Sequence, residues 1–330
     1  MTLTVAPFPV DLAESLTLAE AALRSRLAPG ERFDDFWPQI SSGIRTGRLN
    51  GGLLRKEHAT CGVATWDSAG PFGVSVRLLY LTPPNATGEG YREALDSVGR
   101  VAGAIAFTTG QLSGLNDADE RLVMDERGFA PFGRLEMALP VSVSVRTGDV
   151  PVGVAVRPVV PGDEAALARL HERAYRNHLD RYLAIEDLDP VRDAELQLRQ
   201  YFSGRFGEVL SPGSTLVLVD REVASAVITT RRPNQALIID VMSDPDRQGR
   251  GFARLALTES IRQLRDRGET AIALNVTVGN DRAHRLYLGV GFVQTMGPTK
   301  EWFDARRMPV EWPRAFARYA ASGGGVSAGR

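Results

Sequence analysis

Two short segments in the second half of the chain carry residues that could bind a phosphate and move a proton. The first is a glycine-rich turn, Gln248-Gly249-Arg250-Gly251-Phe252-Ala253, which follows an apolar run ending at Met242. The second runs from Asn280 to Phe292, presents one tyrosine, Tyr287, on a helical pattern, and then stops at a glycine. A loop that can hold a pyrophosphate, followed by a lone phenol, indicates group transfer from a nucleotide-like carrier.

The turn has the chemistry of an anion site because it precedes a helix. Backbone N–H groups at a helix start are unpaired, and the helix dipole adds partial positive charge there, so a diphosphate can bind without a cationic cage. Gly249 and Gly251 lack the Cβ atoms that would hold the phosphate away, and Arg250 can add a charge-assisted contact. A plain tight turn has the same appearance, and neither a P-loop lysine nor a full dinucleotide fingerprint is present.

Apolar spacing places these segments among alternating strands and helices. Asp163 and Asp189 are expected to cap helices, with Pro190 in a first helical position, and Gly268 to end the helix that follows the turn. The second half is thus expected to contain strands near 154–160, 214–219, 224–229, 236–242 and 272–276, with helices after 163, after 189, over 252–267 and over 280–291.

The first half repeats this order, which indicates an internal duplication. Residues 84–91 compare with 245–252 without a gap, and Gly128-Phe129 matches Gly291-Phe292. We therefore expect an N-terminal domain over 1–148, a C-terminal domain over 149–318 and a disordered tail over 319–330. Two domains are also what 330 residues predict, since one domain holds about 150 residues.

Composition excludes several classes of protein. The net charge of −1 gives no electrostatic reason to expect nucleic acid or a membrane as partner. The single cysteine, Cys61, excludes an internal disulfide and a thiolate cluster, and the four histidines have no metal-ligand spacing, so no metal is expected. Neither a signal peptide nor an apolar run of about 18 residues is visible, which predicts a cytoplasmic protein.

Together the two segments resemble the GNAT family of acyl-coenzyme A dependent N-acetyltransferases. Gln248, Gly251 and Ala253 fit the family's Q/R-x-x-G-x-G/A pyrophosphate signature. The later segment fits N-x-x-A-x-x-L-Y-x-x-x-G-F at Asn280, Ala283, Leu286, Tyr287, Gly291 and Phe292. The resemblance covers roughly 152–305. It implies an α/β fold of two tandem GNAT domains, each a twisted mixed sheet flanked by helices, whose fourth and fifth strands splay apart in the active copy.

The resemblance also implies a cosubstrate, acetyl-CoA, and a role for each motif residue. Backbone groups of Val241 and Met242 would pair with pantetheine and polarise the thioester carbonyl. The diphosphate would lie on Arg247, Gln248, Gly249, Arg250, Gly251, Phe252 and Ala253. Asn280 would contact the cofactor near its thiol end. Tyr287 would protonate the departing thiolate, although tyrosine at helical spacing is often a core residue.

The sequence gives less information about which residue acts as the general base. Relatives often use a carboxylate on the fourth strand, and Asp240 lies there. Strand alternation would place Asp240 on the face of Ile238 and Met242, opposite Val241. A structural aspartate is an equally good reading of this position.

The first copy departs from the pattern where chemistry would occur. Thr87 replaces the Gln/Arg of the turn, Glu89 stands in place of Arg250, and Met124 falls on the tyrosine position. A carboxylate at a diphosphate site is unfavourable. A degenerate first copy joined to an intact second one is similar to the architecture of mycothiol synthases and related two-domain acetyltransferases.

The leading hypothesis is therefore an N-acetyltransferase whose C-terminal domain moves acetyl from acetyl-CoA to a primary amine of a small molecule, by direct attack in a ternary complex. The alternatives are a non-catalytic acyl-CoA sensor or scaffold, and an acetyltransferase of proteins or peptides. The sequence contains no motif that identifies the acceptor. We expect contacts to the acceptor from residues 177–196 and from residues near Trp302. Either a monomer or a homodimer is compatible with the sequence.

Overall fold

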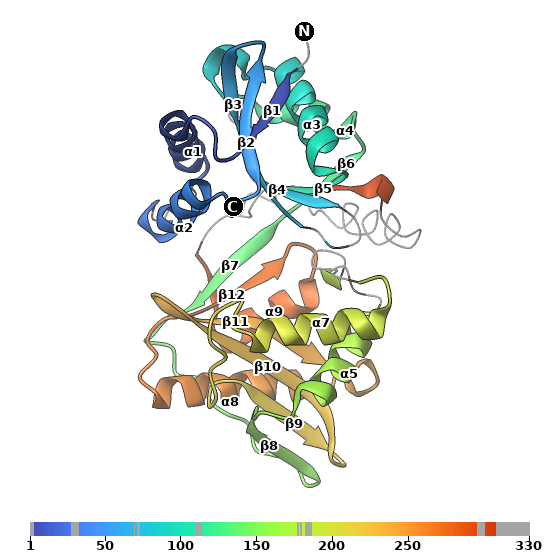
Figure 1. The fold of residues 1–330 in the computed structure, drawn as a ribbon. Helices are drawn as coiled ribbons and strands as arrows, with labels where there is room; N and C mark the ends of the chain where they lie inside the picture. The colour runs from blue at the N-terminus through green and yellow to red at the C-terminus, as the bar shows by residue number, and fades with distance from the viewer. Residues whose placement is uncertain are drawn as a thin grey trace. The chain divides into compact units, whose positions relative to one another are not determined.

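The chain forms two compact units, each built around one sheet (Figure 1). The computed structural model describes residues 3–27, 33–68, 70, 73–109, 112, 114–176, 178, 180–181, 187–295 and 301–307. Unit 1 comprises Met1–Gly133 and Thr299–Ala317, and unit 2 comprises Arg134–Pro298 and Arg318–Arg330. The tail expected to be disordered, 319–330, lies outside the described residues.

Unit 1 carries a seven-stranded mixed sheet in the order β1-β2-β3-β4-β5-β14-β6. Its strands are antiparallel except for β4 and β5, which run parallel. The elements are β1 (Thr4–Pro7), α1 (Leu12–Arg26), α2 (Phe33–Thr46), β2 (Gly51–Lys56), β3 (Ala59–Ser68), β4 (Val74–Leu81), α3 (Gly88–Ala102), β5 (Ile105–Thr109), α4 (Asp117–Asp125), β6 (Phe129–Phe132) and β14 (Glu301–Asp304).

Unit 2 has the same design, with the order β8-β9-β10-β11-β12-β7-β13 and one parallel pair, β11 with β12. Its elements are β7 (Arg134–Leu139), β8 (Val154–Pro158), α5 (Glu164–Tyr175), α7 (Pro190–Phe202), β9 (Thr215–Val219), β10 (Glu222–Arg232), β11 (Gln235–Ser243), α8 (Phe252–Asp266), β12 (Ile272–Thr277), α9 (Asp281–Val290) and β13 (Val293–Gln294).

The two sheets match strand for strand, so the predicted duplication and the predicted mixed-sheet fold class are confirmed. One strand in each sheet comes from the other half of the chain: β7 completes unit 2, and β14 completes unit 1. Gly133 alone separates β6 from β7. One residue is too few for the usual hairpin turn, so the chain does not fold back beside β6. The units therefore divide at 133/134 and 298/299 rather than at the expected 148/149.

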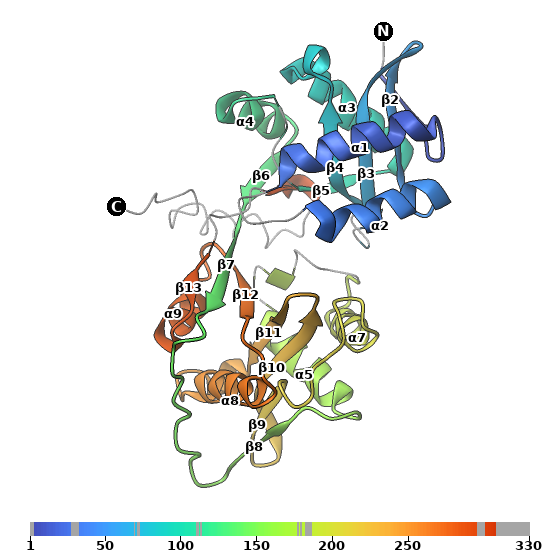
Figure 2. The same cartoon turned by 90° about the vertical axis from the view of Figure 1, so that its left-hand side faces the viewer.

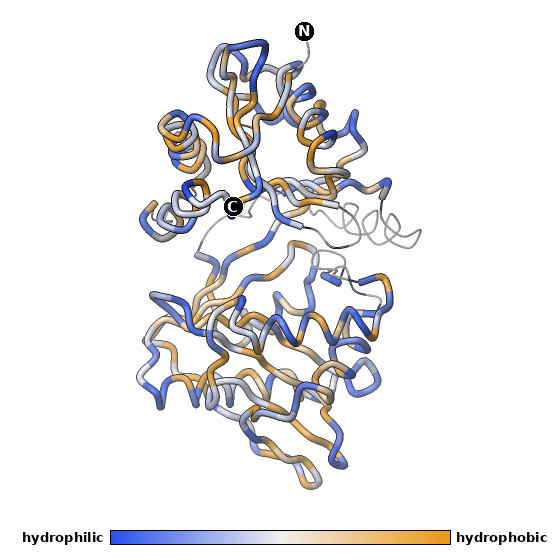
Figure 3. The backbone as a smooth tube through the Cα atoms, in the orientation of Figure 1, coloured by the Kyte–Doolittle hydropathy of each residue, from blue (hydrophilic) through white to orange (hydrophobic). Residues whose placement is uncertain are grey.

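Each sheet of the pair is buried on both faces by helices (Figure 2). In unit 2, α8 packs on one face, where Leu257, Ile261 and Leu264 meet the strands, and α5 and α7 pack on the other through Leu167 and Leu198. Apolar stretches accordingly follow the inner strands and the inward helix faces in Figure 3. The helices expected after 163, after 189 and over 252–267 thus each bury an apolar face against the sheet.

Strands β11 and β12 separate after three paired residues. Ladder pairing runs from Ala236↔Ile272 to Ile238↔Leu274 and stops there, while β12 continues on β7 up to Thr277. The splay expected between the fourth and fifth strands is present. It leaves the backbone from Ile239 onward open on the β12 side.

Some local details differ from expectation. Asp163 precedes α5, but its carboxylate binds the Arg157 guanidinium at 2.7 Å instead of capping the helix. Trp302 lies in the sheet of unit 1, 1% exposed, and donates to Glu120 at 2.9 Å. Its indole therefore lies in the core of unit 1. Asp189 does cap α7, and Pro190 opens that helix as predicted.

Candidate active site

Two cavities of unit 2 meet along a shared wall at the splay of β11 and β12. The turn cavity, of about 410 Å³, is lined by Gln248, Gly249 and Gly251 among others. The carboxylate cavity, of about 360 Å³, is lined by Asp240 and Asp180 among others. Five residues line both cavities: Tyr175, Val241, Asn280, Ala283 and Tyr287. A molecule reaching from one cavity into the other would pass these five side chains.

The turn before α8 leaves a helix N-terminus open to solvent. Gly249 and Gly251 have φ of +79° and +82°, a conformation that other residues rarely adopt. A Cβ at either position would meet no atom within 4 Å, so the space above the backbone is free. The first turn of α8 has neither a side-chain cap nor an acidic residue. Its N–H groups are therefore available to an anion such as a diphosphate.

Replacing Gly251 by valine should weaken coenzyme A binding by about tenfold or more, because a β-branched residue is strained at positive φ and would fill the space above the turn. Gly268→Val is the matched control: Gly268 ends the same helix at φ +84°, with open space around it and away from both cavities. Isothermal titration calorimetry separates the two effects. Equal affinity losses in both variants would contradict the proposed diphosphate site.

Tyr287 reaches the shared wall from α9. Its side chain is 7% exposed, packs edge-on against Phe292 at 6.1 Å between ring centres, and belongs to the α8-side core. Burial, with the nearby carboxylates of Asp240 and Asp180, raises the pKa of this phenol, so it is protonated at neutral pH. The residue thus has a packing role and also lines both cavities.

Asp240 lies in a buried cluster of hydroxyl groups. Its carboxylate accepts a hydrogen bond from Tyr175 Oη at 2.5 Å and one from Tyr201 Oη at 3.2 Å. The side chain is only 1% exposed. Burial raises the pKa of Asp240 to about 7, against the lowering effect of the two tyrosine hydroxyls, and the charge of Asp180 adds to the rise. A carboxyl with this pKa can exchange a proton near neutral pH.

A β-bulge at Ile239 turns Asp240 toward α5 and α7. The β10–β11 register shifts between Ile228↔Asp240 and Thr229↔Ile238, which leaves Ile239 as the extra residue. Ile238 therefore packs on the α8 side and Met242 on the α5–α7 side. The expectation that Asp240 shares a face with both Ile238 and Met242 was wrong for Ile238, because simple alternation fails at the bulge.

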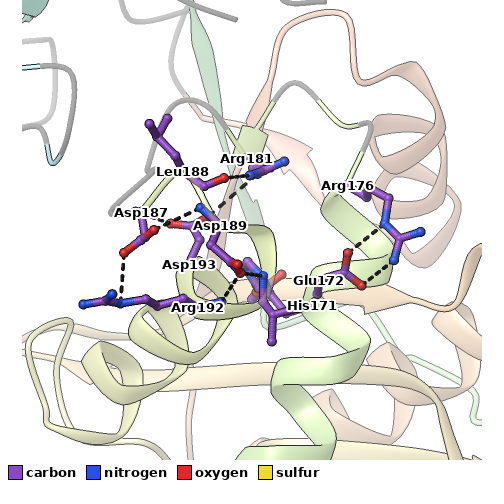
Figure 4. Close-up of polar contacts among 11 residues, drawn as sticks. His171, Glu172, Arg176, Arg181, Asp187, Leu188, Asp189, Arg192 and Asp193 are labelled. Atoms are coloured by element: carbon purple, nitrogen blue, oxygen red, sulfur yellow. Dashed lines mark hydrogen bonds and ion pairs between the residues drawn. The ribbon is translucent and has the colours of Figure 1, made fainter.

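Residues of α5 and of the start of α7 also line the carboxylate cavity, among them His171 and Asp193. Figure 4 labels both residues and the polar contacts around them. Burial lowers the pKa of His171 to about 4, with Arg181 adding to the effect, so the imidazole 3.9 Å from the Asp240 carboxylate is neutral. Arg181 donates to the Leu188 carbonyl at 3.3 Å and lies 3.9 Å from the Asp193 carboxylate. These contacts tie the residues before α7 to the cavity wall.

Of the other residues predicted for the site, some line the cavities and others do not. Arg247 lines the turn cavity, but its guanidinium binds Glu222 at 2.7 Å and the Val219 carbonyl at 3.1 Å. Gln248 accepts a hydrogen bond from Arg282. Phe252 and Ala253 line the turn cavity, whereas Arg250 and Met242 line neither cavity. Asn280 caps α9 by accepting a hydrogen bond from Ala283 N at 3.2 Å.

A model of the GNAT acetyltransferase family matches residues 166–292. This range includes the turn and the five residues that line both cavities. Residues 166–292 of the chain thus match the GNAT family. It is 31% identical over 151 residues to the mycothiol acetyltransferase of Kytococcus sedentarius, a match that covers 44% of this chain and 47% of that protein. The matching region thus spans about half the length of the curated relatives.

Solved GNAT structures share the fold over nearly the whole chain. A GCN5-related N-acetyltransferase from Sphaerobacter thermophilus has a TM-score of 0.60 at 18% identity, covering 91% of this chain and 94% of that one. A tandem GNAT protein from the clavulanic acid biosynthesis pathway has a TM-score of 0.53 at 16% identity, covering 91% and 97%. These likenesses concern the fold, and they extend the GNAT architecture to both units.

Unit 1, formed mainly by the first half of the chain, differs from unit 2 at the residues that compare with the turn. Residues 88–90 form the first turn of α3 rather than a loop, so the gapless comparison with 249–251 does not hold in space. Thr87 Oγ1 accepts a hydrogen bond from Gly90 N at 3.1 Å and so occupies a backbone donor that would face a phosphate. At the matching bulge of β4, Leu78 stands where Asp240 follows the bulge of β11. Met124 is fully buried.

Sequence reasoning missed two residues of the candidate site, Tyr175 and Tyr201. Tyr175 follows His171 by four positions on α5, and the two rings lie 4.5 Å apart. That i, i+4 pair of polar aromatic residues on an otherwise apolar face was the available signal. Nothing in the local pattern of α7 marks Tyr201, since its partner is distant in sequence.

In the described part of the chain, no helix is long and apolar enough to cross a membrane. Within the same residues, no group of three or more His, Cys, Asp or Glu side chains is placed to hold a metal ion.

Proposed function

We propose that this protein is an N-acetyltransferase that moves an acetyl group from acetyl-CoA to a primary amine of a small molecule, with its active site in unit 2. The observation that carries the proposal is the pair of cavities that meet at Tyr175 and Tyr287. One cavity has an open helix N-terminus for a diphosphate, and the other has a buried carboxyl that titrates near neutral pH. A ternary complex can occupy both at once.

The cofactor would lie along the turn cavity. The first N–H groups of α8, with Gly249 and Gly251 below, would hold the diphosphate. The pantetheine arm would follow the open edge of β11, where the Val241 backbone lacks a β12 partner. When bound, acetyl-CoA supplies an activated acyl group whose leaving thiolate has a pKa of about 8.5. This route brings the thioester to the shared wall.

Groups of the chain at that wall and beside it would accept and donate the protons. Asp240, in its ionised form, would receive the proton that the amine loses on attack. Tyr287 would donate its hydroxyl hydrogen toward the departing sulfur. The ordinary pKa of a phenol, about 10, already exceeds that of a thiol, and burial raises the pKa of Tyr287 further. Full proton transfer is therefore uphill, and a hydrogen bond to the developing negative charge is the main contribution.

The size and polarity of the carboxylate cavity favour a small polar acceptor. It holds about 360 Å³ and is lined by both carboxylates and guanidinium groups, among them Asp180, Asp193, Arg134 and Arg232. An acceptor with hydroxyl or charged substituents beside its amine would find partners there. An acyl-CoA sensor would need the turn cavity but not the buried carboxyl beside it.

The test is release of free thiol from acetyl-CoA by the full chain, across a panel of amines, amino acids, amino sugars and aminoglycosides. Compounds of the mycothiol type belong in the panel, because a relative bears that name. Amine-dependent release with an acetylated product is expected. Tight coenzyme A binding without release on any amine would favour the sensor, and acetylation confined to peptides would favour a protein substrate.

Coenzyme A should bind with a stoichiometry of one per chain, because Thr87 already occupies a donor at the start of α3 in unit 1. Thr87→Val should cost about 1 kcal/mol of stability through loss of a helix cap, and leave coenzyme A affinity unchanged. Thermal unfolding and calorimetry measure the two quantities. A second binding event, in the wild type or in the variant, would contradict the assignment of the cofactor site to unit 2 alone.

A further inference from the structure

Asp240 is poorly placed to touch the amine itself. Its side chain is 1% exposed, both carboxylate oxygens already accept tyrosine hydrogen bonds, and it lines the carboxylate cavity only. The acetyl group is expected where the two cavities meet. The group that receives the amine proton should therefore be one that reaches this wall and is connected to Asp240.

Tyr175 meets both conditions. It lines both cavities, its side chain is only partly buried, and its hydroxyl donates to Asp240 Oδ1 at 2.5 Å. Tyr201 donates to the other oxygen at 3.2 Å but lines the carboxylate cavity alone. The two tyrosines thus share one carboxylate, and one of them also faces the proposed thioester.

We propose that Tyr175 relays the acceptor's proton to Asp240. This inference rests on the acetyl transfer proposed above and assigns a catalytic residue to it. As the amine nitrogen bonds to the acetyl carbon, its N–H bond breaks and Tyr175 Oη takes the proton. The Tyr175 O–H bond breaks in the same step, and Asp240 Oδ1 takes that proton. The carbon–sulfur bond breaks, and its electron pair leaves with the sulfur.

Both transfers must be concerted, because an isolated tyrosinate would be unstable there. Burial and the charge of Asp240 raise the pKa of the Tyr175 phenol well above 10. Three titratable side chains lie against the Asp240 carboxyl: His171 and Tyr175 on α5, and Tyr201 on α7. Asp180 and Tyr287 interact with it electrostatically. His171 is neutral, so Tyr175 gives Asp240 its short hydrogen-bonded path to the wall.

Tyr175→Phe and Tyr201→Phe are a matched pair, since each removes one hydroxyl group from the same carboxylate and keeps the ring. We expect Tyr175→Phe to lower kcat/KM for the acceptor by about 10²-fold, within the range of positioned acid–base catalysis, and to leave acetyl-CoA affinity unchanged. Tyr201→Phe should lose about fivefold or less, and should mainly move the acid limb of the pH profile upward, because it removes a hydrogen bond that stabilises the ionised Asp240.

Rates of the wild-type protein in mixtures of light and heavy water give a second readout that needs no variant. Two protons in flight predict a curved dependence of the rate on deuterium fraction, and a direct transfer to Asp240 predicts a straight line. Equal losses in the two phenylalanine variants, or a straight line in the wild type, would overturn the relay while the acetyl transfer stands. A wild-type protein that acetylates no amine would overturn both proposals.

Discussion

Tyr287→Phe should lower kcat by roughly 10²-fold or more while coenzyme A affinity changes by less than about twofold. The variant keeps the ring that packs edge-on against Phe292, so the α8-side core is preserved. It removes only the hydroxyl group that is proposed to meet the departing sulfur. The loss should therefore appear in kcat and kcat/KM together, as expected for an interaction made in the transition state.

The control for this variant is Tyr91→Phe. Tyr91 is a fully buried tyrosine of unit 1, and its pKa is also raised by burial. Its change removes the same atom from a core that has no part in the proposed chemistry, so kcat should remain near that of the wild type. Steady-state kinetics and calorimetric titration of both variants decide the matter. A Tyr287→Phe enzyme with full turnover would show that the hydroxyl group has no role in thiolate departure.

Asp240→Asn should abolish most amine-dependent turnover and remove the acid limb of the pH profile. In the wild type, kcat/KM should fall about tenfold per pH unit below about 7, because the proposed base is protonated there. An asparagine cannot accept the proton at any pH. The pH dependence of both proteins, measured with one acceptor, tests this; an unchanged acid limb in the variant would assign it to another group.

The same substitution has a second expected effect, on stability. The pKa of Asp240 is raised from 3.8 to about 7 in the folded state. Below pH 3.8 both states are protonated, and no penalty exists. Between these values only the unfolded state ionises, so the free energy of unfolding falls as pH rises, by about 4 kcal/mol in total. Above about pH 7 the penalty is constant. Urea unfolding at pH 4.5 and 7.5 should show this fall in the wild type and a smaller one in Asp240→Asn.

The elements of the fold that have strong local signals were predictable from sequence. The Asp189–Pro190 start of α7, the turn before α8 and the end of α8 at Gly268 all combine a period with a capping residue. The exchange of β7 and β14 was not predictable in this way. It depends on which distant strand a segment pairs with, and the sequence of a short strand such as Glu301–Asp304 does not indicate its partner.

For the candidate site, sequence reasoning identified groups that lie on contiguous motifs. The turn residues and Tyr287 were found because each motif is local. Tyr175 and Tyr201 were missed because they meet Asp240 across 65 and 39 residues of chain. The face of β11 that carries Asp240 was predicted wrongly for a related reason. The bulge at Ile239 arises from the pairing of β11 with β10, and the alternation of residues within one strand does not reveal it.

The exchange of strands also determines when each sheet can be finished during synthesis. The sheet of unit 1 lacks the strand between β5 and β6 until Glu301–Asp304 has left the ribosome. Until then β5 and β6 each present an unpaired edge, which is a site for pairing with other chains. Unit 2, by contrast, receives β7 before any of its other strands is made. The half that is synthesised first is therefore completed last, and a chain truncated after Pro298 would leave the earlier sheet open.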